Sequence, residues 1–563
     1  MNKRQIIECV PNFSEGRDLT IIKQITDVIE SVEGVKLLDV DPGKATNRTV
    51  VTFVGEPEPV IRAAFLAIKK AAEVIDMRKH HGEHPRMGAT DVCPLVPIAN
   101  ITMEETVKWA HKLGEMVGRE LDIPFYMYEY AATRPDRKNL ADIRTGEYEA
   151  LPEKLTKPEW KPDYGPAKFN AKAGATAIGA RDFLIAYNVN LNTTSTRRAN
   201  SVAFDVREKG RVKREGDPIT GKIVTDKNGE PVRIPGTCKA VKAIGWYIEE
   251  YGIAQISMNL TNINVTPLHI AFEEVCKSAD RRGLRVTGSE LVGLVPLNVM
   301  LEAGRYFLRK QRRSVGISEE EIIKIAVKSL GLDELTPFDP QKKIIEYQLT
   351  ADTPAPLLNM NLRAFSNETA SESPAPGGGS VSAYVGALGV SLGTMVANLS
   401  SHKRGWDDRW EYFSDHAAKG QELKDALLKI VDEDTAAFNR ILEAFRMPKG
   451  SAEEKAARSA AIQAATQYAI EVPFRAMELS LAAFDLLKAM VEKGNPNSIT
   501  DAGVGALCAR AAVHGAFMNV QINSKDLKDR AFVEEILQKG ADMAARADKL
   551  EAEIREFIQS KIQ

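Results

Sequence analysis

The stretch QIIECVPNFSEGRDLTIIKQITDVIESVEGVKLLDVD, residues 5–41, decides the fold of the first half of the chain. Residues 5–13 and 35–41 are rich in β-branched and apolar residues, whereas 19–32 has apolar residues at helical spacing. The next strings repeat this order, because RTVVTFV at 48–54 runs into the helical pattern at 60–75. Strands that alternate with helices over short connections predict a layered α/β or α+β domain.

A second cycle of strands and helices begins at Phe183 and ends near Lys310, which predicts a smaller domain of related architecture. A polar insert, 208–236, interrupts this cycle. Its string Asp226-Lys227-Asn228-Gly229 predicts a surface hairpin without a role in chemistry.

Strand patterns almost disappear after two linker prolines, Pro354 and Pro356. Long Ala- and Leu-rich helical patterns, such as 451–472 and 473–493, follow and predict an all-α helical bundle. The expected domains are 1–183, 184–349, a linker at 350–361 and the helical domain 362–563.

Composition excludes several classes of protein. With 44% hydrophobic and 27% charged residues, the 563-residue chain is typical of globular proteins of several domains. Lysine plus arginine (75) balances aspartate plus glutamate (77), so there is no global basic field for nucleic acid. The start lacks a secretory apolar segment, no stretch looks like a membrane span, and the five cysteines are scattered without a CxxC pair. We therefore expect a soluble cytoplasmic protein.

The string HHGEHPRMGATD, residues 80–91, concentrates three of the eight histidines within five positions. Three interpretations are open: a polar surface loop, a metal site of His80 or His81 with His84, and acid–base catalysis by one histidine. Gly82 and Pro85 spoil the helical register that HExxH metal sites use, which favours the catalytic interpretation modestly.

Several long strings resemble one family, formimidoyltransferase-cyclodeaminase, the folate enzyme of histidine breakdown. The matching strings are 8–16, 38–41, 47–50, 82–88, 146–152, 245–247 and 291–296, and the resemblance continues through the C-terminal third. It implies two ferredoxin-like subdomains followed by a helical cyclodeaminase domain. It also implies tetrahydrofolate as co-substrate, no metal, and a homo-oligomer built from dimers.

By this resemblance, His84 is the catalytic histidine of the transferase. The segment that would bind folate is Gly165-Pro166-Ala167-Lys168-Phe169-Asn170-Ala171-Lys172-Ala173-Gly174. Its aromatic ring, lysines and glycines suit folate, although an ordinary basic loop has the same composition.

The resemblance implies that the transferase moves the formimino group from N-formimidoyl-glutamate to N5 of tetrahydrofolate. This reaction needs a base for the N5 proton and an acid for the departing glutamate amine. One neutral histidine can serve as both in turn, and His84 is the candidate. Arg48 and Arg86 are candidates for binding the glutamate carboxylates, and Asp41 for facing the cationic amidine. An exposed salt bridge is the alternative role of each arginine.

In the helical third, the pattern at 421–445 places an acid among apolar residues. Asp434 falls on a stripe formed by Leu427, Val431, Phe438, Ile441 and Phe445. A buried acid is costly unless it is paired or functional, and desolvation raises its pKa. A structural aspartate paired with an arginine is the alternative. The resemblance identifies Asp434 with the catalytic aspartate of the cyclodeaminase.

Pro376 is followed by Gly377, Gly378, Gly379 and Ser380 at the start of a helix, where exposed N–H groups can bind a folate carboxylate. A closely packed helix start is equally consistent with these residues. The polar loop 494–501 is a further candidate for lining the same cleft.

Two other functions remain open. One is a metal-dependent hydrolase that uses His80, His81 and His84. The other is a transferase whose helical domain serves only in oligomerisation.

Overall fold

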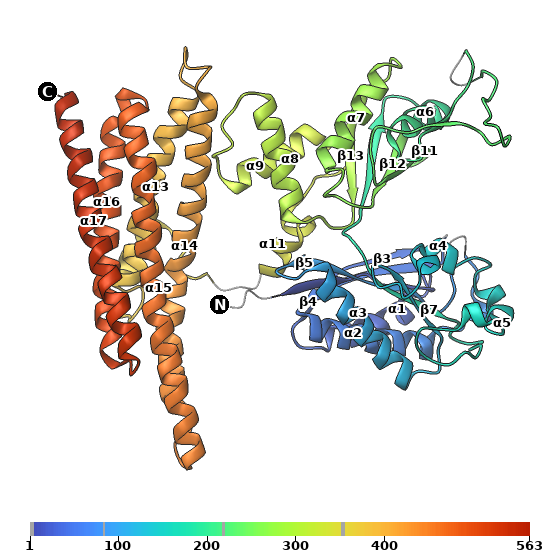
Figure 1. The fold of residues 1–563 in the computed structure, drawn as a ribbon, viewed down its shortest axis with the longest axis horizontal. Coiled ribbons are helices and arrows are strands. Elements are labelled where there is room, and N and C mark those ends of the chain that lie inside the picture. Colours follow the sequence, from blue (N-terminus) through green and yellow to red (C-terminus); the bar gives the residue numbers. More distant parts are fainter. Residues whose placement is uncertain (1–4, 45, 83–84, 217–219, 351–354, 563) are drawn as a thin grey trace. The chain divides into compact units, whose positions relative to one another are not determined.

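The computed structural model describes residues 5–44, 46–82, 85–216, 220–350 and 355–562 (Figure 1). They form two compact units. The first is Met1–Ala303 with Leu330–Ala351, and the second is Gly304–Ser329 with Asp352–Gln563. The four domain limits expected from the sequence stay predictions.

The first unit begins with a seven-stranded sheet. Its elements are β1 (Ile6–Cys9), β2 (Asn12–Phe13), α1 (Leu19–Glu30), β3 (Val35–Gly43), β4 (Arg48–Gly55), α2 (Pro57–Val74), β5 (Thr90–Ala99), α3 (Met103–Glu120), β6 (Phe125–Glu129) and β7 (Thr176–Ala180). Strand β3 pairs with β4, β4 with β1, and β1 with β5, all antiparallel, whereas β7 and β6 extend the sheet in parallel. The core is thus a βαββαβ unit with strand order β3-β4-β1-β5, which is ferredoxin-like.

Local sequence explains why these helices begin where they do. Asp18 accepts hydrogen bonds from the first backbone N–H groups of α1, and Thr102 forms a capping box with Glu105 at α3. Helices α1 and α2 pack against each other and, together with α3, cover one face of the sheet (Figure 1). On β1, Ile7 and Cys9 belong to the core beneath these helices, so the alternate residues face the other side of the sheet.

The second half of this unit repeats the topology in a four-stranded sheet. Its elements are β8 (Ile185–Leu191), α6 (Thr196–Val206), β11 (Val241–Ile248), β12 (Ile253–Leu260), α7 (Leu268–Asp280) and β13 (Val286–Val292). The order β11-β12-β8-β13 is again ferredoxin-like. The predicted fold, two ferredoxin-like subdomains, is therefore confirmed.

The polar insert contains β9 (Arg211–Val212), which pairs with β10 (Arg233–Ile234). The predicted hairpin lies between them. Asp226 N–H donates to the carbonyl of Glu230, and Gly229 has a positive φ of 83°. Shorter helices complete the part of the chain before the bundle: α4 (Leu140–Ile143), α5 (Leu151–Lys154), α8 (Leu297–Lys310), α9 (Glu319–Leu330), α10 (Pro340–Lys343) and α11 (Ile345–Thr350).

The second unit contains the predicted helical bundle. Its helices are α12 (Leu362–Thr369), α13 (Gly378–Ser401), α14 (Trp410–Arg446), α15 (Ala452–Lys493), α16 (Ile499–Asn523) and α17 (Arg530–Ile562). The sequence predicted two helices at 451–472 and 473–493, but α15 is one helix with Pro473 inside it. Proline removes one backbone N–H donor, yet α15 continues through Pro473, which is buried in the bundle.

Helix α13 differs from one further expectation. It is long and apolar enough to cross a membrane, whereas the sequence analysis expects no such stretch. Within the bundle, 61% of its apolar window is buried, as in the core helix of a soluble protein.

Candidate active sites

Two cavities lie in the first unit, beside the sheet face that α1–α3 leave uncovered. Their volumes are about 1090 Å³ and about 1100 Å³. The residues that line both are Asn12, Arg48, Arg181, Leu184 and Asn259. These residues come from both sheets and from the segment that joins them, so the two ferredoxin-like halves build one continuous site.

The two weaker substrate-binding candidates lie at this site. Arg48 begins β4 and lines both cavities, and Asp41 near the end of β3 lines the first. Burial and the like charge of Arg144 lower the pKa of Arg48. Arg144 itself forms an ion pair with the buried Asp91. A partly desolvated cation at the meeting point of the cavities suits a carboxylate ligand.

The catalytic candidate His84 and its neighbour Glu83 lie outside the described residues. Pro85, the next residue in the chain, lines the second cavity together with Asn12 and Arg48.

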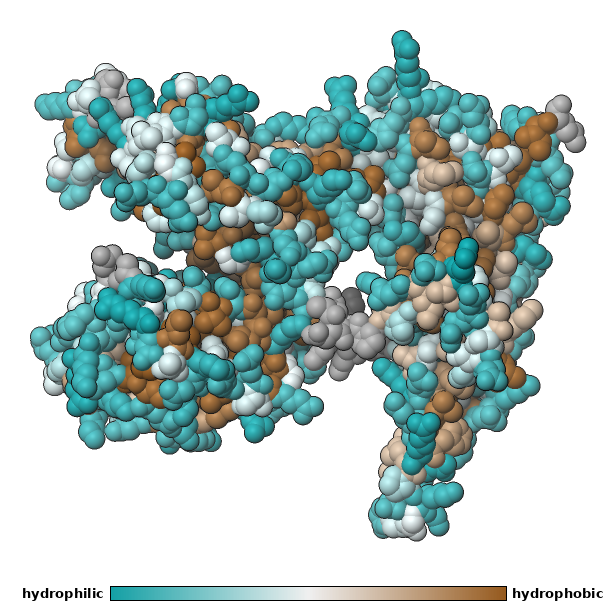
Figure 2. All heavy atoms as spheres, turned by 180° about the vertical axis from the view of Figure 1, so that it is seen from behind, coloured by the Kyte–Doolittle hydropathy of each residue, from teal (hydrophilic) through white to brown (hydrophobic). Residues whose placement is uncertain are grey.

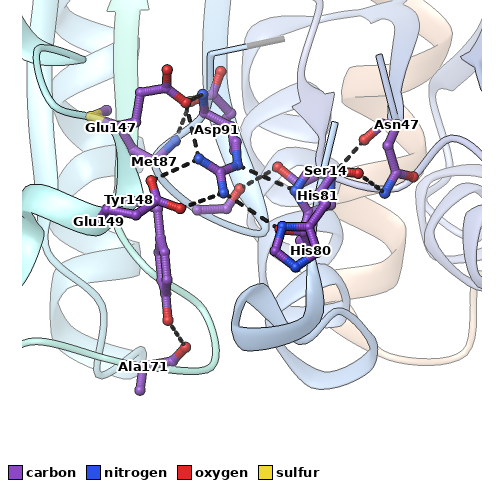
Figure 3. Close-up of polar contacts among 12 residues, drawn as sticks. Ser14, Asn47, His80, His81, Met87, Asp91, Glu147, Tyr148, Glu149 and Ala171 are labelled. Atoms are coloured by element: carbon purple, nitrogen blue, oxygen red, sulfur yellow. Dashed lines mark hydrogen bonds and ion pairs between the residues drawn. The ribbon is translucent and has the colours of Figure 1, made fainter. Parts of the chain in front are cut away.

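His80 is buried and fixed in one tautomer. Its Nε2 lies 2.8 Å from the carbonyl oxygen of Asn47, which can only accept, so Nε2 carries the proton. Its Nδ1 then accepts from Nε of Arg86 at 3.3 Å, and burial lowers the pKa of His80. Figure 3 shows His80 beside Asn47. Both ring nitrogens are occupied, so His80 is neither a metal ligand nor a free base.

The metal interpretation therefore loses one of its ligands. Within the described ranges, no group of three or more His, Cys, Asp or Glu side chains is placed to hold a metal ion. His81 is exposed, and its backbone carbonyl accepts from the amide of Asn47 at 3.0 Å.

Arg86 is engaged by protein carboxylates. Nη1 lies 2.9 Å from Glu147 and Nη2 lies 2.7 Å from Glu149, and both glutamates belong to the 146–152 string. These ion pairs raise the pKa of Arg86, the one with Glu149 most. Its side chain is only 10% exposed. We therefore reassign Arg86 from carboxylate binding to positioning of the histidine loop.

Replacement of Arg86 by lysine tests this reassignment. Lysine cannot form the forked contacts with Glu147, Glu149 and His80. We expect the variant to lose about 2 kcal/mol of stability and to transfer the formimino group more slowly, with little change in KM for N-formimidoyl-glutamate. A tenfold rise in that KM without loss of kcat in steady-state assays would instead restore Arg86 as a carboxylate ligand.

The predicted folate segment, 165–174, lies against the histidine loop. Ala89 N–H donates to the Ala173 carbonyl at 2.8 Å, and Ala175 N–H donates to the Met87 carbonyl at 3.0 Å. A Cβ atom on Gly88 would lie 2.3 Å from the carbonyl oxygen of Ala175, so only glycine permits this approach.

Tyr148 of the 146–152 string contacts both the histidine loop and the predicted folate segment. Its backbone N–H donates to the Arg86 carbonyl, and its hydroxyl donates to the Ala171 carbonyl at 2.5 Å (Figure 3). Its ring packs on Phe169, with centroids 5.5 Å apart. The structure thus brings residues 86–89 of the histidine loop together with the strings 146–152 and 165–174, although the last lines neither of the two large cavities.

Sequence reasoning missed Glu8. Its side chain lines the first cavity and is only 4% exposed. The cross-strand neighbours are Val54 on β4 and Val96 on β5, so neither offers a donor. Burial raises the pKa of Glu8 to about 7, against a smaller opposing effect of Arg181. The alternation of Ile7 and Cys9 around Glu8 could have placed it on the opposite sheet face, but not shown its burial.

This carboxylate makes the stability of the transferase part depend on pH. The folded pKa of about 7 lies above the ordinary glutamate pKa of 4.5, so the contribution of Glu8 to stability is complete below pH 4.5 and is lost as pH rises through 7. The loss is at most about 3 kcal/mol at 1.36 kcal/mol per unit. We expect Glu8→Gln to raise Tm at pH 8 and to change it little at pH 5. Equal Tm differences at both pH values in thermal scans would contradict this.

The second candidate site lies at the first turn of α13. Asp434 on α14 is partly buried, and its Oδ2 lies 3.3 Å from the hydroxyl of Ser380. Burial raises the pKa of Asp434, whereas hydrogen bonds from the hydroxyl and backbone N–H of Ser380 oppose this shift. A Cβ atom on Gly379 would lie 2.2 Å from Asp434, so the carboxylate sits directly on the glycine turn.

The three acids at 432–434 have separate environments. Asp432 accepts from the backbone N–H groups of Leu357 and Leu358, and Glu433 binds Arg475 and Tyr468. Among the described residues, Asp434 forms no ion pair with an arginine, which weakens the alternative of a structural ion pair. Gly377 caps α13 without a side chain, and Gly378 lies next to the Asn519 amide.

Two expectations about this region are wrong. Asn495 N–H donates to the hydroxyl of Ser400 at the far end of α13, so the loop 494–501 does not line the Asp434 site. The predicted stripe is buried only at Leu427 and Val431, because Phe438 is 42% and Phe445 is 53% exposed. The end of α14 extends beyond the bundle core, which periodicity alone cannot reveal.

Comparisons with known proteins cover nearly the whole chain. Residues 6–181 match the formiminotransferase domain, N-terminal subdomain; 186–350 match the formiminotransferase domain; and 361–542 match formiminotransferase-cyclodeaminase. The formimidoyltransferase-cyclodeaminase of Gallus gallus is 44% identical over 535 residues, 95% of both chains.

Two relatives match one part each. The glutamate formimidoyltransferase of Streptococcus pyogenes serotype M1 is 43% identical over 305 residues, 54% of this chain and 94% of its own. The methenyltetrahydrofolate cyclohydrolase of Methylorubrum extorquens is 37% identical over 204 residues, 36% of this chain and 98% of its own.

Two ferredoxin-like halves around a polar site, joined to a helical bundle with its own acid, define a two-module enzyme of folate chemistry. The chain belongs to the formimidoyltransferase-cyclodeaminase family. It is a bifunctional enzyme in which a glutamate formimidoyltransferase precedes a formimidoyltetrahydrofolate cyclodeaminase, and tetrahydrofolate is the co-substrate.

Proposed function

We propose that the two half-reactions run at two separate sites, the first beside His84 and the second at Asp434. In the first, N5 of tetrahydrofolate attacks the formimino carbon of N-formimidoyl-L-glutamate. The new C–N5 bond gives a tetrahedral intermediate, and its bond to the glutamate nitrogen then breaks. His84 takes the N5 proton and returns it to the departing amine.

The surrounding residues hold the reactants in this proposal. Arg48 binds a glutamate carboxylate at the meeting point of the cavities, and Asp41 faces the amidine cation. The segment 165–174 binds folate beside the histidine loop. Arg86 keeps that loop in place through Glu147, Glu149 and His80.

In the second half-reaction, N10 attacks the same formimino carbon and closes the ring. Asp434 removes the N10 proton and delivers it to the departing ammonia, which leaves 5,10-methenyltetrahydrofolate. A carboxylate with a raised pKa suits both steps. The glycine-opened turn at Gly377, Gly378, Gly379 and Ser380 provides backbone N–H groups near the folate carboxylates.

The observation that carries the proposal is that Asp434 and the described part of the histidine loop have different surroundings. Asp434 on α14 lies against the first turn of α13, whereas residues 86–89 of the histidine loop contact 146–152 and 165–174. Separate assays of each half-reaction on His84→Ala and Asp434→Asn test it.

A homo-oligomer built from dimers is also proposed, with an apolar face of the bundle as the contact. Leu388, Met395 and Leu399 on α13 are 38–48% exposed, and Val504 and Leu507 on α16 are 49–51% exposed. Both sets recur at helical spacing. Helices α13 and α16 pack closely, because a Cβ atom on Gly389 would lie only 2.8 Å from the carbonyl oxygen of Gly505. Figure 2 shows apolar side chains gathered along the bundle.

Charge on this face should separate the subunits. We expect Leu388→Glu with Leu507→Glu to give a species of lower mass in analytical ultracentrifugation, because apolar contact drives such association. The matched control is Ile562→Glu at the end of α17, which is 61% exposed but outside the stripe. An unchanged mass for the double variant would rule out this face.

We further propose that the protein works in the cytoplasm. No disulfide joins any of the five cysteines, which all lie in the described ranges, and the sulfur atoms of Cys9 and Cys93 are 3.5 Å apart without a bond. Such thiols persist in a reducing compartment.

A further inference from the structure

The Glu8 carboxylate lines the first cavity, and no protein group among the described residues forms a hydrogen bond with it. Arg181 acts on it only at longer range. The other acid on the opposite wall, Glu290, accepts from the amide of Asn188 at 3.2 Å. A buried carboxylate with two unused acceptor oxygens is costly, so its retention calls for a partner that is absent from the free protein.

The chemistry of the substrates limits what that partner is. Two parallel N–H donors on an N–C–N edge match the two oxygens of a carboxylate. Two groups in the proposed reaction offer such an edge. One is the formimino group of N-formimidoyl-glutamate, and the other is the N3–H and 2-amino edge of the pterin ring.

The position of Glu8 favours the pterin. Along β4, Glu8 lies opposite Val54, whereas Asp41 lies opposite Val50. Asp41, which faces the amidine in the proposed function, is therefore nearer Arg48 at the meeting point of the two cavities, and Glu8 is farther from it. The formimino carbon has to meet N5, while the N3 and 2-amino edge lies across the ring from N5. The apolar residues Val10, Phe183 and Leu184, which line the first cavity, suit the faces of an aromatic ring.

We propose that Glu8 binds the amidine-like edge of the pterin of tetrahydrofolate in the transferase site through two hydrogen bonds. This inference rests on the proposed function and adds a specificity residue to it. Binding of the pterin satisfies the buried carboxylate, so Glu8 lowers the stability of the free enzyme in exchange for recognition of folate. The expected gain in Tm of Glu8→Gln at pH 8 has the same cause, because the substitution removes the buried charge from the free enzyme.

The test uses the full chain and the transfer reaction alone, followed by glutamate release. Glu8→Gln should raise KM for tetrahydrofolate at least tenfold and change KM for N-formimidoyl-glutamate less than twofold. Wild type should also discriminate strongly against a tetrahydrofolate analogue with methyl in place of the 2-amino group, and the variant should not. Glu58→Gln, with its side chain 79% exposed on α2, is the control for both constants.

The outcomes separate the possibilities. A rise confined to KM for N-formimidoyl-glutamate would keep the two-point contact but assign it to the formimino group. Unchanged constants for both substrates and retained discrimination against the analogue would overturn the inference. Failure of wild type to release glutamate would instead sink the proposed function. The higher Tm at pH 8 shows that a variant with altered constants is folded.

Discussion

His84→Ala is expected to slow formimino transfer by about 10²–10⁴-fold, the usual contribution of a general acid–base group. Cyclisation of supplied 5-formimidoyltetrahydrofolate should stay within about twofold of wild type, because that step does not use the histidine loop. Glutamate release and formation of 5,10-methenyltetrahydrofolate are measured separately on the same preparation.

His81→Ala is the matched control for this prediction. Its side chain is exposed, and only its backbone carbonyl is used, so transfer should stay close to wild type. If the histidines instead held a metal, both variants would lose activity together with bound metal. Stoichiometric zinc lost from both would contradict the account.

Asp434→Asn is expected to slow cyclisation by about 10²–10⁴-fold and to leave glutamate release intact. Asparagine has nearly the same shape and can still accept the backbone N–H of Ser380 at the start of α13. The fold is therefore retained while the acid–base group is removed. The 5-formimidoyl intermediate should accumulate.

Asp432→Asn provides the control two residues away. Asp432 accepts from Leu357 and Leu358 N–H groups and has no part in the proposed chemistry. Normal cyclisation by Asp434→Asn would make the helical domain an oligomerisation module only.

The sequence predicts the fold well because β-rich segments take turns with segments of helical spacing. The β-rich composition of 5–13 and the helical spacing of 19–32 indicate the element order, and the resemblance implies the ferredoxin-like halves. Strand pairing such as β1 with both β4 and β5 depends on contacts far apart in the chain, which periodicity does not contain.

The site is predicted less completely, since residue type does not reveal partners. Arg86 looked like a substrate ligand until Glu147 and Glu149 were found on its guanidinium. Glu8 looked like an ordinary strand residue, although the cavity buries it. The polar composition of the loop 494–501 suggested that it lines the cleft of Asp434. The loop instead lies at the opposite end of the 24-residue helix α13.

Complementation tests the two-site claim most directly. His84→Ala and Asp434→Asn proteins are mixed with N-formimidoyl-L-glutamate and tetrahydrofolate, and 5,10-methenyltetrahydrofolate is followed. The account predicts that each variant alone forms this product at least about 10²-fold more slowly than wild type and that the mixture forms it readily. A folded single variant that has lost both half-reactions, or a mixture that forms no product, would contradict it.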